Sequence, residues 1–227
     1  MSTTRRSFLT AAGSGALLVS CAGSTHGAER AKSDGGEEEV TPAEDLMREH
    51  GVLRRVMYVY DEASMRLDAQ RDVPLDAVAA GAGIIRHVIE DYHEKIEENL
   101  LFPRFEKAGK LGELTAILRK QHQVGRTLTD QIIALAKAPL ADADRSKLAA
   151  LLRSFNHMYR AHAAREDTVL FPEIRGLVGA KIYAELGEEL EDKEKQMLGD
   201  HGFERAVADV AKLERAFGVD DLAKLTP

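Results

Sequence analysis

Two stretches that repeat one pattern decide the fold: HEKIEENLLFP at residues 93–103 and HAAREDTVLFP at residues 162–172. Each begins with His, carries Glu four residues later and ends in Leu-Phe-Pro. Residues four apart on an α-helix are separated by about 6 Å along the axis and lie on nearly the same face. Each stretch therefore predicts a helix that points one imidazole and one carboxylate in the same direction.

A second pair of matching stretches precedes the first pair. REHGV at residues 48–52 matches KQHQV at residues 120–124 in the order basic residue, any residue, His, any residue, Val. The lone His residues are 72 positions apart, and the two His-x-x-x-Glu motifs are 69 positions apart. The sequence therefore predicts two related helical hairpins, each with one lone His and one His-x-x-x-Glu.

Apolar residues at helical spacing extend outward from these stretches and predict long helices. The capping box Thr41-Pro42-Ala43-Glu44 begins the first helix, and Pro139 ends the third. The predicted helices cover residues 42–71, 74–109, 111–138, 142–176, 180–198 and 202–217.

The connections between the first four helices are short, which makes neighbouring helices antiparallel. We therefore expect an all-α protein with an up-down-up-down four-helix bundle over residues 42–178. Additional C-terminal helices are expected over residues 179–227. No stretch shows a convincing strand alternation.

Composition excludes several classes of protein. The chain has 38 acidic and 31 basic residues, and its formal charge of −7 argues against a nucleic-acid partner because phosphate contacts need a basic surface. One cysteine among 227 residues excludes an intramolecular disulfide and a cysteine-cluster metal site. Eight histidines remain as candidate nitrogen ligands.

The first 21 residues are typical of an export signal, in which Arg5 and Arg6 precede an apolar run too short to span a bilayer. TRRSFL at residues 4–9 resembles a twin-arginine signal, and LVSC at residues 18–21 resembles a lipobox in which Cys21 carries the lipid. An ordinary secretory signal and a chance cysteine are the alternatives. Residues 22–41 are rich in Gly, Ser and charge and predict a flexible linker. We expect an exported lipoprotein, anchored on the periplasmic or extracytoplasmic side of a bacterial membrane.

Six polar side chains of the repeated motifs fall on the apolar stripes of the four predicted helices. They are His50, His93, Glu97, His122, His162 and Glu166. Burial of a carboxylate costs several kcal/mol unless a cation neutralises it, and no Lys or Arg shares these stripes. Imidazole and carboxylate ligands inside a helical bundle suit a dinuclear iron or manganese centre, with two His on each metal and both carboxylates bridging. The alternative, ordinary core histidines bonded to a nearby carboxylate, explains one such motif better than two.

The duplicated His-x-x-x-Glu and Leu-Phe-Pro motif resembles that of the hemerythrin-like, or HHE cation-binding, family over residues 42–176. The resemblance implies a non-haem di-iron centre with an oxo or hydroxo bridge, able to bind dioxygen, peroxide or nitric oxide. It makes the six residues above the metal ligands. Glu94, beside His93, is a candidate for an additional carboxylate ligand, and manganese or zinc could occupy the same residues.

One departure from the family's oxygen carriers bears on function. Those carriers have five His at the irons, whereas this sequence has four at the matching positions, and His157 lies about 140° around the helix from His162. A site with fewer histidines is less suited to reversible oxygen carriage. A di-iron peroxidase or oxidase, and an iron or oxygen sensor or store, therefore stay open as alternatives. No catalytic residue and no electron donor is assigned.

Other polar residues near the candidate ligands are possible supports for the centre. Glu49, Glu90 and Asp61 could each orient a ligand histidine through its second nitrogen. Tyr92 and Tyr159 flank the ligand faces. We expect His87 to be solvated, His157 to lie on the surface or behind the ligands, and His201 to lie in a loop.

Overall fold

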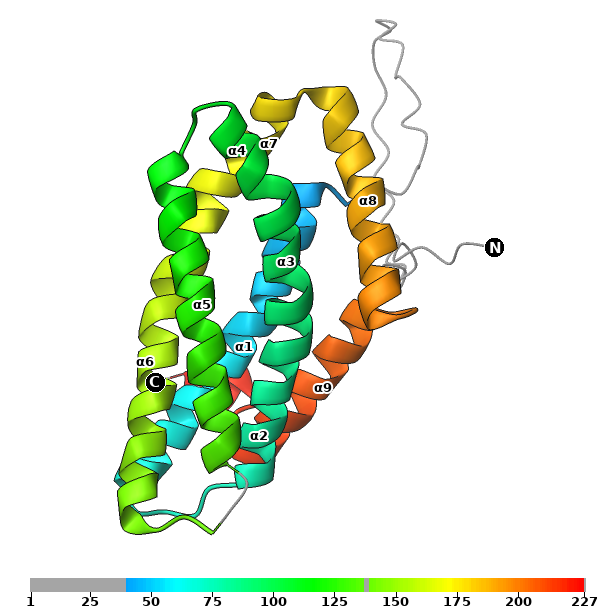
Figure 1. Ribbon diagram of the computed structural model, residues 1–227. Helices are drawn as coiled ribbons and strands as arrows, with labels where there is room; N and C mark the ends of the chain where they lie inside the picture. The colour runs from blue at the N-terminus through cyan, green and yellow to red at the C-terminus, as the bar shows by residue number, and fades with distance from the viewer. Residues whose placement is uncertain (1–39, 137–138, 227) are drawn as a thin grey trace, which may run out of the picture. The chain divides into compact units, whose positions relative to one another are not determined.

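The structure is a computed structural model that describes residues 40–136 and 139–226. Throughout these ranges the regular structure is helical (Figure 1). The predicted export signal, the lipobox at Cys21 and nearly all of the predicted linker lie outside the described residues.

Four long helical rods form the antiparallel up-down-up-down bundle, so the predicted fold class is confirmed (Figure 1). The first rod is α1 (Pro42–Asp68) and the third is α5 (Gly112–Leu135). The second rod runs without a break through α2 (Leu75–Ile84), η1 (Ile85–His93), α3 (Glu94–Ile96), η2 (Glu97–Leu101) and α4 (Phe102–Lys107). The fourth runs through α6 (Asp142–Arg165), η3 (Glu166–Leu170) and α7 (Phe171–Val178).

The rod ends differ from the predicted ends by a few residues. α1 begins as predicted, because the Thr41 side chain accepts a hydrogen bond from the Glu44 backbone N–H. It ends before residue 71 because Gln70 takes a left-handed conformation, with φ of 53°. Leu111 likewise has φ of 54°, so α5 begins one residue after the predicted start.

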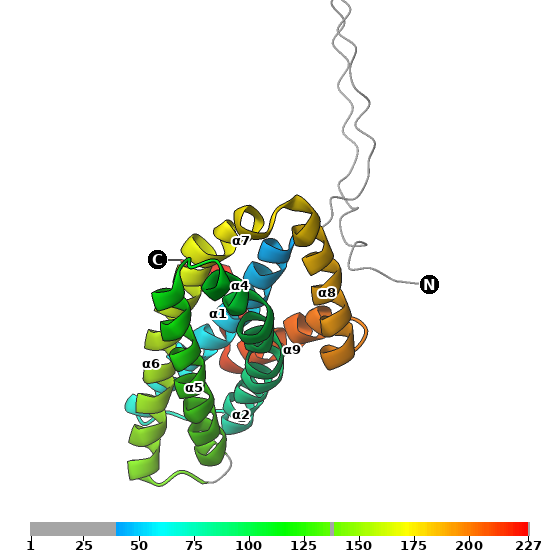
Figure 2. The same ribbon diagram turned by 45° about the horizontal axis from the view of Figure 1, so that its top comes forward.

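Two further helices cover one side of the bundle. α8 (Ala180–Leu198) and α9 (Gly202–Phe217) contact α1, and they also contact η1 and α2 respectively. Figure 2 shows both helices beside the bundle. α9 inserts Val210 and Phe217, which are almost fully buried, into the common core. In the described part of the chain, no helix is long and apolar enough to cross a membrane.

The second and fourth rods contain π-helical turns, which the sequence analysis did not predict. The backbone N–H groups of Phe102 and Phe171 bond the carbonyls of Glu97 and Glu166, five residues back. These two turns, η2 and η3, each close at the residue before a proline, Pro103 or Pro172, whereas η1 has no proline after it. Proline has no N–H, and in a regular α-helix its ring clashes with the carbonyl four residues back. A wider turn ahead of the Leu-Phe-Pro motif lets the rod continue through it, and π-turns of this kind are frequent at functional sites.

Candidate metal centre

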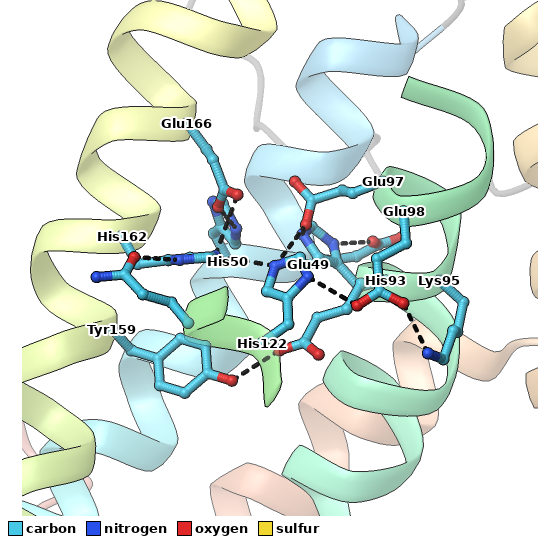
Figure 3. A network of polar contacts seen from close by, with 12 residues as sticks. Glu49, His50, His93, Lys95, Glu97, Glu98, His122, Tyr159, His162 and Glu166 are labelled. Carbon is cyan, nitrogen blue, oxygen red and sulfur yellow. Dashed lines mark hydrogen bonds and ion pairs between the residues drawn. The ribbon is translucent and has the colours of Figure 1, made fainter. Parts of the chain in front are cut away.

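The six side chains predicted as ligands lie together in the middle of the bundle, and each is at most 3% exposed (Figure 3). They come from all four rods: His50 from α1, His93 from η1, Glu97 from η2, His122 from α5, His162 from α6 and Glu166 from η3. Such a cluster of imidazoles and carboxylates inside an apolar core is the donor set expected for a transition metal.

The imidazoles form two pairs. His122 and His162, here called the B pair, place their Nε2 atoms 3.2 Å apart. Nε2 of His122 lies 3.3 Å from Glu97 Oε2, and Nε2 of His162 lies 3.1 Å from Glu166 Oε1. One ligand atom from each of these four residues lies within 4.8 Å of the others, close enough to hold one metal ion.

His50 and His93, here called the A pair, lie on the other side of the two carboxylates, with ring centroids 4.7 Å apart. Nε2 of His50 lies 3.4 Å from Glu166 Oε2, and Nε2 of His93 lies 3.7 Å from Glu97 Oε2. Each carboxylate therefore lies next to one histidine of each pair. This arrangement suits carboxylates that bridge two ions.

The two central carboxylates have no normal hydrogen-bond donor. All four oxygens of Glu97 and Glu166 are buried, and among the described residues none of them accepts a hydrogen bond of ordinary geometry. Nε2 of His93 is buried without such a partner as well. Leaving a buried charged group unsatisfied costs several kcal/mol, whereas a bound cation would satisfy all these atoms at once.

The other ring nitrogens are held by side chains around the cluster. Nδ1 of His93 lies 2.7 Å from Glu49, and Nδ1 of His162 lies 3.0 Å from the side-chain oxygen of Gln121. Because these oxygens accept, each Nδ1 carries the proton and Nε2 is left to face the centre.

The lone histidines are held in a related way. Nδ1 of His50 lies 2.7 Å from Asp167, and Nδ1 of His122 lies 3.1 Å from Glu98. Each of these acceptors is the residue directly after a central carboxylate. All four imidazoles are thus oriented by a hydrogen bond at Nδ1, the nitrogen that faces away from the centre.

The predicted histidine partners are correct only in part. Of the three candidates that the sequence left open, Glu49 contacts a ligand histidine, and Glu90 and Asp61 do not. Glu90 accepts from Thr129 and pairs with Arg86, and Asp61 accepts from Asn156 and Arg160. Asp61 follows His50 along α1, and Glu90 precedes His93 along the antiparallel second rod, so each faces polar residues outside the cluster.

Sequence reasoning missed three of the four histidine partners, namely Glu98, Gln121 and Asp167. The repeat offsets contain the signal that could have found them. Glu98 and Asp167 are 69 positions apart, and Glu49 and Gln121 are 72 apart, the same offsets as the ligands.

Arginines at matching positions neutralise two of the partners. Arg54 pairs with Asp167, and Arg126 lies 2.7 Å from Glu98. Each arginine follows a lone histidine by four residues, so it lies on the same helix face. Pairing with a cation keeps these carboxylates ionised and able to accept from the ring nitrogens.

Glu94, the candidate for an additional ligand, is 1% exposed and lies beside the B pair. It accepts a 2.6 Å hydrogen bond from the Tyr159 hydroxyl and lies 2.7 Å from Arg126. Burial raises the pKa of Glu94, partly offset by His122, Tyr159 and Arg126. Together with Glu98 and His122 it forms a second group of ligand atoms within 4.8 Å of one another.

Charge within the cluster moves the pKa of its imidazoles. Burial lowers the pKa of His50, but Asp167 and Glu166 outweigh burial and raise it to about 9. Burial also lowers the pKa of His122, which Glu97 and Glu98 raise to about 10. In the protein alone, protons on these rings therefore balance the buried carboxylates, and a metal ion would have to displace them.

The remaining histidines of the described chain, His87, His157 and His201, are exposed as predicted. His157 is therefore not a fifth nitrogen ligand. Phe171 stacks on His50 and Phe102 stacks on His122, with ring centroids 5.4 and 5.6 Å apart. The Phe of each Leu-Phe-Pro motif thus covers the lone histidine of the other hairpin and shields the cluster.

Comparison with known proteins agrees with this geometry. The family described as "Hemerythrin HHE cation binding domain" matches residues 41–174. Three relatives, one from Mycobacterium bovis and two from strains of Mycobacterium tuberculosis, are each described as an uncharacterized protein. Each is 40% identical over 225 residues, which cover 96% of this chain and 88% of the relative. No solved structure matches the chain.

Proposed function

Because the chain belongs to the hemerythrin HHE cation-binding family, we propose that its buried His/Glu cluster holds two iron ions and binds dioxygen or a related small oxidant, such as peroxide or nitric oxide. The observation that carries the proposal is the set of four buried carboxylate oxygens that accept no hydrogen bond of ordinary geometry, placed between two pairs of imidazoles. A pair of bound cations would neutralise these buried carboxylates, whereas apolar packing alone would leave them unsatisfied.

The residues of the chain have defined roles in this proposal. The A pair would hold one ion and the B pair the other, and Glu97 and Glu166, each next to one histidine of each pair, would serve both. Hydrogen bonds to the four Nδ1 atoms fix the ring tautomers and orientations. When bound, iron supplies Lewis-acid and redox chemistry toward the oxidant. The stacked Phe rings and the bundle core restrict access of bulk water.

Metal analysis of the purified full chain tests the proposal. We expect two iron ions per chain, and the same stoichiometry after metal removal and anaerobic reconstitution with Fe²⁺. Protein that binds no transition metal would contradict the proposal. Stoichiometric binding of manganese or zinc without binding of iron would support the metal site but contradict the assignment of iron as its metal.

A peroxide-consuming enzyme is the second candidate, and the Glu94–Tyr159 pair favours it. The pair places a buried carboxyl and a phenol hydroxyl beside the B pair, where they could donate protons during turnover. Stopped-flow mixing of the reduced protein with oxygen and then with peroxide separates the two functions. Catalytic consumption of peroxide with an added reductant supports the enzyme, and one stoichiometric, reversible binding step supports the carrier.

We also propose export and lipid anchoring, which rest on the sequence of residues 1–21 alone. A twin-arginine route carries folded cargo and therefore suits a protein loaded with its metal before export. Cys21→Ser is expected to leave the protein without lipid and in the soluble fraction after cell disruption. A variant that stays with the membrane would overturn the lipobox assignment.

A further inference from the structure

The two hairpins surround the cluster with matching contacts. The half of the cluster around the A pair contains His50, Asp167 and Arg54. These residues correspond to His122, Glu98 and Arg126 in the half around the B pair, and both sets make the same hydrogen bonds. The stacked Phe rings and the distances from the lone histidines to the central carboxylates correspond as well. This agreement makes each half a reference for the other.

The halves differ in the acceptor that holds the motif histidine. Nδ1 of His93 is bonded to Glu49, a carboxylate that is 1% exposed. Nδ1 of His162 is bonded to Gln121, a neutral amide that is partly exposed. Glu49 and Gln121 occupy the same position in the repeat, and they have nearly the same size and shape. The difference between the halves at this position is therefore a single negative charge.

Other charged groups near the pairs do not cancel this difference. Beside the A pair, Arg54 neutralises Asp167. Among the described residues Glu49 pairs only with the ring it orients, and its second oxygen is buried without a donor. Beside the B pair, Lys95 and Arg126 neutralise Glu98, and Arg126 with the Tyr159 hydroxyl also serves Glu94. The side of the cluster next to the A pair therefore carries an uncompensated negative charge, and the side next to the B pair does not.

We infer that the two metal positions are inequivalent, with Glu49 making the A pair the tighter site and Gln121 leaving the B pair the weaker one. A carboxylate bonded to the distal N–H of an imidazole makes the metal-facing nitrogen a stronger donor, and a neutral amide does so much less. Loss of such a partner weakens metal affinity by roughly 10–100-fold. Glu49 and Gln121 are thus positioning residues that act through His93 and His162. The inference rests on the proposed function.

The test is a titration of the metal-free full chain with Co²⁺, followed by visible absorption and a competing chelator. The wild type is expected to fill in two steps whose dissociation constants differ by about tenfold or more. Glu49→Gln should weaken the first step by about 10–100-fold and merge the two, whereas Gln121→Glu should strengthen the second step and merge them from the other side.

The double exchange, Glu49→Gln with Gln121→Glu, separates the charge effect from damage to the fold. It should restore two separated steps in the opposite order. His162→Gln and His93→Gln, each placed in the wild type and in the exchanged protein, identify which pair fills first. If Glu49→Gln does not fold, the titration of Gln121→Glu alone tests the inference. This variant is expected to fold because Gln121 is partly exposed, and the change adds a charge rather than removing one.

The outcomes distinguish this inference from the proposed function. Two equal steps in the wild type, or the same shift from both single exchanges, would overturn the inequivalence and leave the dinuclear site intact. A chain that binds no Co²⁺ and no Fe²⁺ would overturn both. Two steps that reverse their order on exchange would establish the roles of Glu49 and Gln121.

Discussion

Gly125 provides a sharp test of the packing around Glu94 and Tyr159. It lies inside α5 and faces the Tyr159 ring, so that a Cβ at this position would lie 2.0 Å from the hydroxyl oxygen and 2.7 Å from Cζ. Tyr159 is 1% exposed, and its ring contacts those of Phe155 and His162 at centroid distances of 4.4 and 5.3 Å. The ring cannot move aside freely, so Gly125→Ala must disturb it.

The expected cost follows from three effects. Forcing an extra methyl group into a packed core costs about 1–3 kcal/mol. Loss of the hydroxyl bond to the buried Glu94 carboxyl adds about 1.5–3 kcal/mol. Alanine returns roughly 1 kcal/mol through its higher helix propensity. Gly125→Ala should therefore lower the free energy of unfolding by about 2–4 kcal/mol.

Urea unfolding followed by far-UV circular dichroism, at one fixed metal concentration, measures this cost. Gly83→Ala is the matched control, because a Cβ there meets nothing within 4 Å and Gly83 also lies in a helix. The control should stabilise the protein by about 0.5–1 kcal/mol. In a Tyr159→Ala background the clash is absent, so Gly125→Ala should become neutral or stabilising. A neutral effect of Gly125→Ala in the wild type, or an equal cost in both backgrounds, would refute the reasoning.

Further predictions concern the ligands and pH. His93→Ala or Glu166→Ala should each abolish binding of a second metal ion and loosen the bundle, and exposed His87→Ala should do neither; equal metal content in all three would refute the ligand assignment. In the folded protein the pKa values of His50 and His122 are raised to about 9 and 10, compared with about 6.5 in the unfolded chain. Protonation of these rings therefore stabilises the metal-free protein, and the stabilisation is complete at pH values below about 6.5. This stabilisation should be lost as the pH rises through about 9–10. Urea unfolding in the presence of a chelator should then show a lower midpoint concentration at higher pH, and a midpoint that does not change with pH would contradict the prediction. Apparent metal affinity should rise with pH up to about 9–10, because below these pKa values binding must release the protons, and competition titrations at pH 6.5 and 8.5 measure the increase.

The helices and their packing were predictable because their signals are local. The predicted ranges 180–198 and 202–217 match α8 and α9 residue for residue. Gly179 separates α8 from α7, Gly199 ends α8 and Gly218 ends α9, all with positive φ angles. The six candidate ligands converge as expected because each lies on an apolar stripe and the stripes of a bundle must meet.

The contacts around the cluster were less predictable because they depend on how far each rod is rotated. The π-turns after Glu97 and Glu166 change the rotation within the rod, and an apolar pattern at helical spacing does not show them. Glu90 was one of three candidates to orient a ligand histidine but contacts Thr129, and Asp167 was not a candidate although it accepts from His50. These assignments require the direction of one side chain, which helical periodicity gives only within a wide arc.

The related hairpins have a consequence for how such a protein can change over time. If two identical hairpins assembled as a symmetric dimer, every substitution would appear twice, and both ends of the cluster would stay alike. Here both hairpins belong to one polypeptide, so a substitution in one hairpin leaves the sequence of the other hairpin unchanged. Gln121 opposite Glu49, and Ala163 at the position that corresponds to Glu94, are differences that a symmetric dimer could not hold.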